Sequence, residues 1–311
     1  MTMLSARNEK LYGRRLLSLA DQAVGPLRTI AERSLREMRD NLPPDWPELI
    51  RQRHTDKALA MLTLPGILSG VVKADAPQRG AENESKTFEM LLAALMWGVS
   101  GDALLNSLII GPAGATLDSR ASSRIAEWAR AASVALVSGI VTRSQESLRL
   151  FLAAPTDPDV GRRRRPEATI LNHVGLTTSQ SAALARYEAS LPRNWSLGRA
   201  ERALRRRSDV LLRRRAETIA RTEALAAANK SLILRWDELA ARGLFDKKVA
   251  YLYWITTPDD RLCELCAPMS GLRIPYGNEF RSPSGDSRLV SPVSYPPLHP
   301  LCRCTMGLDY E

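Results

Sequence analysis

All four cysteines of this 311-residue chain fall in its last fifth, in two short motifs. Cys263 and Cys266 form a Cys-x-x-Cys pair, and His299, Cys302 and Cys304 follow in the segment His-Pro-Leu-Cys-Arg-Cys. Two thiolates on one tight turn suit a tetrahedral ion, because structural Zn²⁺ takes four Cys or His ligands. We expect the motifs to converge on one site, whose candidate metal ligands are Cys263, Cys266, His299, Cys302 and Cys304.

The four cysteines could also have a role other than metal binding. They could be packed, reduced cysteines without a metal, or form disulfides or a redox pair. Residues 1–15 are charged and lack the apolar core of a signal peptide, so we expect the chain to start in a cytoplasm, where thiols stay reduced. Zn²⁺ is the expected ion, since metal binding would supply folding free energy to a tail rich in Pro and Gly. Either His299 or Cys304 could be the fourth ligand.

The elements that must position these residues are long helices and a short strand. Thr177 and Gln180 predict a capped helix start, and the pattern predicts long helices over 176–243 that end at Gly243. The stretch 248–255 is β-branched and aromatic, which is typical of a strand. We expect a small Cys-rich α+β tail over 248–311.

The first half of the chain predicts helices and no strand. Apolar residues recur at helical spacing over 4–42, with a break at Gly25-Pro26, then over 48–64 and most clearly over 118–152. Residues 74–86 are polar and predict a surface loop. The apolar stretch 90–117 is interrupted by Gly and Pro, so we expect a buried helical hairpin and no membrane span. The fold class is therefore mainly α.

A linker divides the chain. Residues 156–167 carry prolines and a run of four arginines, a composition that cannot bury apolar area. The predicted domains are a helical N-terminal domain over 1–155, a basic Pro-rich linker over 156–167 and a second domain over 168–311.

Positive charge is concentrated in one segment. Between Gly161 and Arg221 there are fifteen arginines and five acids, an excess equal to the net charge of +10 of the whole chain. Such a segment predicts sequence-independent contact with DNA, although a solvated helix face paired to acids would have the same composition. The candidate nucleic-acid-binding residues are Arg162, Arg163, Arg164, Arg165, Arg205, Arg206, Arg207, Arg213, Arg214 and Arg215.

Motifs for catalysis are scarce. We find no phosphate-binding glycine loop, nucleophile elbow or His-Glu-x-x-His pattern, and we assign no catalytic residue. Asp259 and Asp260 follow a proline and more often cap a turn than bind a metal. His54 and His173 stand alone, as structural histidines usually do.

Three motifs in this order resemble the phage Mu F-like head morphogenesis, or minor head, proteins. They are the helix Ala-Glu-Thr-Ile-Ala-Arg-Thr-Glu, the stretch from Trp254 through Cys-x-x-Cys to Gly271, and the closing His-Pro-x-Cys-Arg-Cys. The resemblance covers about residues 170–311. Besides the cysteines and His299, the matching positions are Arg221, Thr222, Glu223, Trp254, Asp260, Arg261, Gly271 and Arg303.

The resemblance implies a non-catalytic minor component of a tailed-phage or prophage head. Its expected partners are the portal protein, other head components and packaged DNA, and its expected place is the procapsid interior or virion head, after synthesis in the host cytoplasm. One alternative is a group-transfer enzyme resembling ADP-ribosyltransferases, which would use Arg221, Glu223 and the turn at Asp259-Asp260-Arg261. Another is a cellular zinc-containing nucleic-acid-binding protein.

Overall fold

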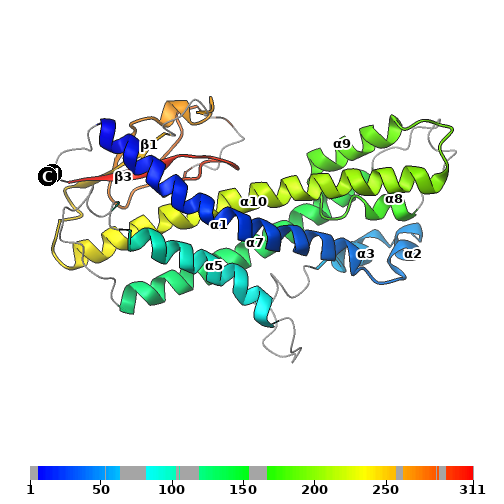
Figure 1. The fold of residues 1–311 in the computed structure, drawn as a ribbon, viewed down its shortest axis with the longest axis horizontal. Coiled ribbons are helices and arrows are strands. Elements are labelled where there is room, and N and C mark those ends of the chain that lie inside the picture. The colour runs from blue at the N-terminus through cyan, green and yellow to red at the C-terminus, as the bar shows by residue number, and fades with distance from the viewer. Residues whose placement is uncertain are drawn as a thin grey trace. The chain divides into compact units, whose positions relative to one another are not determined.

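The computed structural model describes residues 6–52, 54–63, 82–102, 105, 119–153, 167–256, 262–284, 286 and 292–310. The chain is mostly helical, with a small antiparallel sheet close to the C-terminus, as expected (Figure 1). The longer helices are α1 (Ala6–Asp40), α5 (Glu82–Ser100), α7 (Ser119–Ala153), α9 (Thr178–Ala189) and α10 (Leu197–Ala241).

Helix α1 corrects one expectation, because it continues through Gly25 and Pro26. The proline removes one backbone hydrogen bond, which normally ends or kinks a helix. The buried apolar stripe runs on both sides of it, and tertiary packing of such a stripe supplies most of the stability of a helix in a protein. The buried stripe includes Leu16, Ala20, Val24, Leu27, Ile30 and Leu35.

The segment after α1 also differs from the prediction. Instead of one helix over 48–64, the described residues form α2 (Trp46–Arg51) and α3 (Thr55–Ala60). The indole N–H of buried Trp46 donates to the carbonyl of Ala58 at 2.8 Å and holds the two short helices together. Of the expected loop over 74–86, residues 82–86 are helical, and the rest lies outside the described residues.

Helices α7, α9 and α10 lie close to the ranges that the sequence patterns indicate. In α9 the Thr177 side chain accepts from the backbone of Gln180, whose side chain accepts from the Thr177 N–H, which forms a capping box. Gly243 follows α10 with φ 76°, the left-handed conformation that ends many helices. Helix α7 matches the expected 118–152 closely.

The chain packs as two compact units. Unit 1 contains Met1–Leu27, Glu89–Arg130 and Thr218–Glu311, and unit 2 contains Arg28–Phe88 and Ala131–Glu217. Each unit therefore takes segments from before and after the predicted linker. Residues 156–166 of that linker lie outside the described residues. Its last residue, Glu167, is the first residue of α8 (Glu167–Leu171). The division into domains at 156–167 stays a prediction.

The sheet belongs to unit 1 and has the order β2-β1-β3. β1 (Ala250–Ile255) pairs antiparallel with β2 (Arg273–Pro275) and with β3 (Thr305–Tyr310). Tyr253 pairs with Gly307, and a Cβ at position 307 would lie 2.2 Å from the tyrosine ring. Only glycine therefore lets the buried ring of Tyr253 lie across β3.

One stretch of α7, Ser123–Ala153, is long and apolar enough to cross a membrane, with a mean hydropathy of 1.3 and 28% of its most apolar window buried. The core helix of a soluble protein meets the same criterion, so this single helix is weak evidence for a span. Within 90–117, the stretch that looked most like a span in the sequence, the described residues are 90–102 and 105, which include part of the shorter apolar helix Phe88–Ser100. The rest of the expected hairpin lies outside the described residues.

Candidate metal centre

The first cysteine pair lies on a turn attached to the central strand. The carbonyl of Cys263 accepts from the backbone of Cys266 and Ala267, at 3.1 and 3.0 Å, which closes the turn before a short 3-10 helix (Ala267–Met269). Gly271 has φ 72°, and its N–H donates to the carbonyl of Trp254 in β1 at 3.0 Å. Gly271 and Trp254 thus dock the cysteine turn on the sheet.

The second motif forms another turn immediately before β3. The Cys302 N–H donates to the carbonyl of His299 at 3.1 Å, and Leu301 has φ 61°. A left-handed leucine is strained, and such residues persist where surrounding contacts hold them. This conformation places His299 and Cys302 on one compact turn.

Two side chains of α10 hold this second turn. Thr222 accepts the backbone N–H of Leu301 at 3.2 Å, while its own hydroxyl donates to the Thr218 carbonyl. Two helical turns further, the buried Asn229 donates to the carbonyl of Cys304 at 3.4 Å and accepts from the Thr305 hydroxyl at 2.7 Å. The helix motif and the closing cysteine motif are therefore parts of one structure.

The two cysteine motifs meet in a single cluster. The His299 Nε2 lies 3.1 Å from the Cys263 Sγ and 3.0 Å from the Cys266 Sγ. The Cys266 and Cys302 sulfurs are 3.7 Å apart, and all four cysteines are free thiols. The five side chains form two overlapping triads, Cys263–Cys266–His299 and Cys266–Cys302–Cys304, within each of which the donor atoms lie no more than 4.8 Å apart.

These donors fit a metal ion. A pair of Zn–S bonds of about 2.3 Å at a tetrahedral angle separates the sulfurs by about 3.8 Å, close to the Cys266–Cys302 distance. The His299 Nδ1 lies 2.8 Å from the Pro300 carbonyl, to which it donates, so the Nε2 lone pair faces the thiols. The cluster is able to hold a metal ion.

Hydrogen bonding makes the three buried thiols unequal. Bonds to Cys266 and Cys304 lower the pKa of the Cys302 thiol to about 2. Bonds to Cys302 and Cys304, together with burial, raise the pKa of Cys266. For Cys304 the bond to Cys266 acts to lower the pKa, but the bond to Cys302 and burial raise it to about 12. Cys302 is thus the sulfur that its surroundings favour as a thiolate.

The other positions of the family resemblance that the structure describes belong to unit 1. Trp254 is buried and packs edge-on against Phe280, with ring centroids 5.1 Å apart. Arg221 pairs with Asp21 of α1 at 3.2 Å. Glu223 is half-buried. Burial raises the pKa of the Tyr295 hydroxyl, and the negative charge of Glu223 raises it further by a smaller amount. Arg303 is half-buried, and Asp260 and Arg261 lie outside the described residues.

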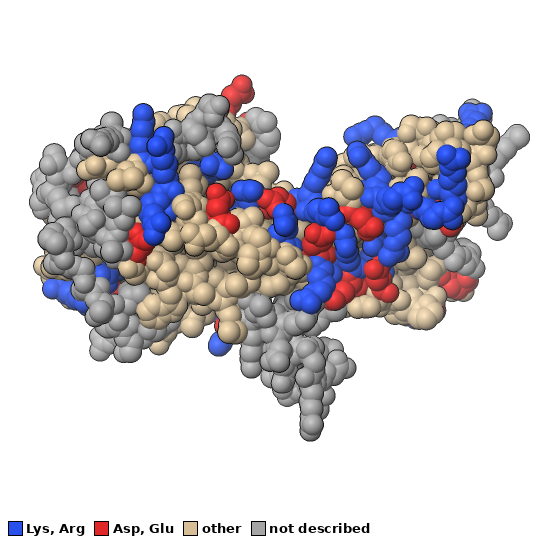
Figure 2. All heavy atoms as spheres, in the orientation of Figure 1, with Lys and Arg blue, Asp and Glu red and all other residues tan. Residues whose placement is uncertain are grey.

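The predicted nucleic-acid-binding arginines differ in exposure. Arg205, Arg206, Arg213 and Arg214 are exposed on α10, and Figure 2 shows basic side chains gathered around this part of the helix with acids among them. Arg205 pairs with Asp40 at 2.9 Å and Arg213 with Glu32 at 3.3 Å. Arg207 is half-buried, with its guanidinium 5.7 Å from the ring of Tyr187. Arg162, Arg163, Arg164 and Arg165 lie outside the described residues.

Arg215 is a correction to the sequence prediction. Its side chain is buried in unit 2, where it donates to Ser144 at 2.9 Å, to the Gly175 carbonyl and to the Ile140 carbonyl at 3.3 Å. Burial, followed by repulsion from Arg143, lowers the pKa of the guanidinium to about 10. Arg215 therefore holds the interior of unit 2 together, and its side chain is buried rather than on the exposed face of α10.

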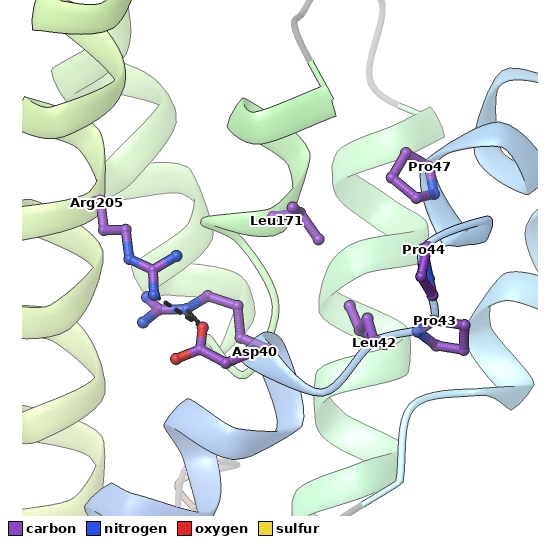
Figure 3. A pocket seen from close by; sticks show the side chains of 8 residues that line it. Asp40, Leu42, Pro43, Pro44, Pro47, Leu171 and Arg205 are labelled. Atoms are coloured by element: carbon purple, nitrogen blue, oxygen red, sulfur yellow. Dashed lines mark hydrogen bonds and ion pairs between the residues drawn. The ribbon is translucent and has the colours of Figure 1, made fainter.

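Unit 2 also contains a cavity of about 520 Å³ (Figure 3). Its wall is apolar on the side of Leu42, Leu171 and three prolines, while Arg39 and Arg205 both donate to Asp40 Oδ1 at 2.9 Å on the other side. The lining does not include Arg221 or Glu223, the residues on which the group-transfer alternative depends. The cavity gives that alternative no support.

The fold and the cluster together define a helical protein with a Cys/His cluster beside a small C-terminal sheet, which Thr222 and Asn229 tie to the long helix α10. Within that class, the family model described as Phage Mu protein F like protein matches residues 172–307. This part of the chain is therefore similar to phage Mu F-like proteins. Comparisons with curated proteins and with solved structures find no match.

Proposed function

We propose that the protein is a minor head protein that acts in head morphogenesis of a tailed phage or prophage. The observation that carries the proposal is the family match over 172–307, which spans the α10 motif and both cysteine motifs. The contacts of Thr222 and Asn229 with the 301–305 segment support it, because they give the three separated motifs one shared structural purpose. The expected location is the procapsid interior and then the virion head, after synthesis in the host cytoplasm.

Its proposed partners are the portal protein and packaged DNA. Support for DNA comes from the exposed arginines of α10, since neutralising phosphates releases counterions and favours binding without sequence preference. Arg206 makes no hydrogen bond or ion pair with the described residues, so its charge is available to a phosphate. Arg205 and Arg213 would have to exchange Asp40 and Glu32 for phosphates, at the modest cost of breaking exposed ion pairs.

Zn²⁺ is the ion that we propose for the Cys/His cluster. Thiolate and imidazole donors in tetrahedral arrangement favour Zn²⁺ among the common cellular ions. The ion would be structural, holding the two turns together beside a sheet that has three strands among the described residues. We propose no catalytic step.

Head particles from a host carrying the gene provide the test. Mass spectrometry of heads purified from cells with the intact gene should find the chain, and cross-linking should join it to the portal protein. Heads from a deletion strain should package DNA poorly or fail to deliver it. Heads that lack the chain and form and infect normally without its gene would overturn the proposal.

A further inference from the structure

The Cys/His cluster offers five donors, whereas a tetrahedral ion takes four. One side chain is therefore surplus, and the sequence leaves open which one it is. We infer that Cys263, Cys266, His299 and Cys302 ligate the metal and that Cys304 is a structural cysteine outside the ligand set. This inference rests on the proposed Zn²⁺ binding and adds the identity of the ligands.

His299 belongs to the site because its ring is already oriented. The Nε2 atom lies within 3.1 Å of two sulfurs, while the Nδ1–H is committed to the Pro300 carbonyl. A hydrogen bond of this kind on the second ring nitrogen fixes the tautomer and the orientation of metal-binding histidines. The first triad, Cys263, Cys266 and His299, thus needs one more ligand.

Cys302 is better placed than Cys304 to be that ligand. Its sulfur is already 3.7 Å from the Cys266 sulfur and accepts the backbone N–H of Cys304 at 3.5 Å, a hydrogen bond that helps to orient it. Its own N–H bonds the carbonyl of His299, so the two side chains belong to one turn and can shift together. Closing the turn around an ion would bring both toward Cys263.

Cys304, unlike Cys302, is prevented from shifting toward Cys263 by contacts with α10 and the sheet. Its carbonyl accepts from Asn229, and the next residue, Thr305, bonds Asn229 and pairs with Ile255 in the sheet. Cys304 is 1% exposed and immediately precedes β3. Movement toward Cys263 and His299 would break the first pair of the β1–β3 ladder. Cys304 therefore suits a packing position beneath the metal.

X-ray absorption at the zinc edge, on the full chain purified without chelators, tests the ligand set. We expect about three sulfur ligands near 2.3 Å and about one nitrogen near 2.0 Å. A shell of four sulfurs would overturn the inference, because it would replace His299 by Cys304. A chain without bound metal would overturn both the ligand set and the zinc proposal, and would leave the role in the head to be judged by the particle experiment.

Two serine variants separate the neighbouring thiols. Cys304→Ser should keep the zinc content and the absorption spectrum of the wild type, whereas Cys302→Ser should lose its zinc. The reverse pattern would contradict the assignment. If Cys302→Ser does not fold, the spectrum of Cys304→Ser decides alone: three sulfurs and one nitrogen support the inference, and a loss of one sulfur overturns it.

Discussion

Thr222 of α10 accepts the backbone N–H of Leu301 at 3.2 Å, across 79 residues of sequence. The contact connects the helix motif to the closing cysteine motif and supports the left-handed backbone of Leu301. Asn229 makes the matching contact with Cys304 seven residues further along the helix. One side of α10 thus serves as the base on which the candidate metal centre is built.

Thr222→Val should destabilise the protein by about 1 kcal/mol, because an isosteric methyl leaves the Leu301 N–H without its acceptor. Urea unfolding would measure the loss, and amide exchange should accelerate at Leu301 and Cys302. Thr222→Ser keeps the hydroxyl and is the matched control, expected to stay close to the wild type. Equal exchange in both variants would show that this hydrogen bond does not hold the turn.

Gly307→Ala should be strongly destabilising, by about 3 kcal/mol, because the new methyl would overlap the ring of Tyr253. The free energy of unfolding measures this effect. Gly98→Ala is the matched control, since a Cβ at that position of α5 meets open space, and alanine there should add about 0.5–1 kcal/mol. A Gly307→Ala variant as stable as the wild type would mean that β3 does not lie against Tyr253.

Asp237→Asn should destabilise unit 1 at neutral pH by about 2 kcal/mol, since the carboxylate accepts from Arg124, Lys247 and Tyr276. Burial acts to raise the pKa of Asp237, but these three hydrogen bonds outweigh it and hold the pKa below its ordinary value. The stabilisation is therefore complete above the unfolded pKa and lost as the pH falls through the folded one.

Unfolding of wild type and Asp237→Asn at pH 7 and near pH 3 measures this dependence. The difference in stability between the two proteins should shrink at the lower pH. Glu279→Gln removes an exposed carboxylate and should show little difference at either pH. A gap between wild type and Asp237→Asn that is unchanged by acid would contradict the ion-pair explanation.

Replacing Arg205, Arg206, Arg213 and Arg214 by Gln should weaken binding to duplex DNA of any sequence. The slope of log affinity against log salt concentration should fall by about 1 for each lost phosphate contact. Glu32→Gln should act in the opposite direction, because it releases Arg213. Affinity and salt slope that are unchanged in the quadruple variant would refute the DNA contact.

Arg215→Gln is a further control in the same experiment. Its loss should lower the free energy of unfolding by about 2–4 kcal/mol, since the Gly175 carbonyl and Ser144 lose a buried partner, and should leave the salt slope unchanged. A reduced salt slope in the folded variant would return Arg215 to the DNA-binding set.

The sequence predicts the cysteine cluster because local spacing and residue type carry that information. The turn at Cys263–Cys266 and the strand at 250–255 are short-range features, and both are where the patterns indicate. The unbroken α1 could not be predicted in this way, because its continuity through Pro26 depends on packing far along the chain. The two-unit division likewise depends on contacts between distant segments.

The burial of Arg215 can be predicted from its position along the helix but not from the composition of the segment. In the run Arg213-Arg214-Arg215 all three residues carry the same charge, yet only Arg215 faces the interior. Its position follows from helical phase, because residues seven apart lie on nearly the same side of a helix. Four polar residues of α10 spaced by seven bond the backbone of segments outside the helix: Ser208, Arg215, Thr222 and Asn229.

Native mass spectrometry of the full chain, combined with amide exchange before and after chelation, tests the central claim most directly. The claim is that a metal ion joins the turn at Cys263–Cys266 to the turn at 299–302, which Thr222 of α10 holds in place. We predict about one Zn²⁺ per chain and, after chelation, faster exchange in both turns while α9 stays protected. A metal-free chain in which both turns are already fully protected would contradict the account.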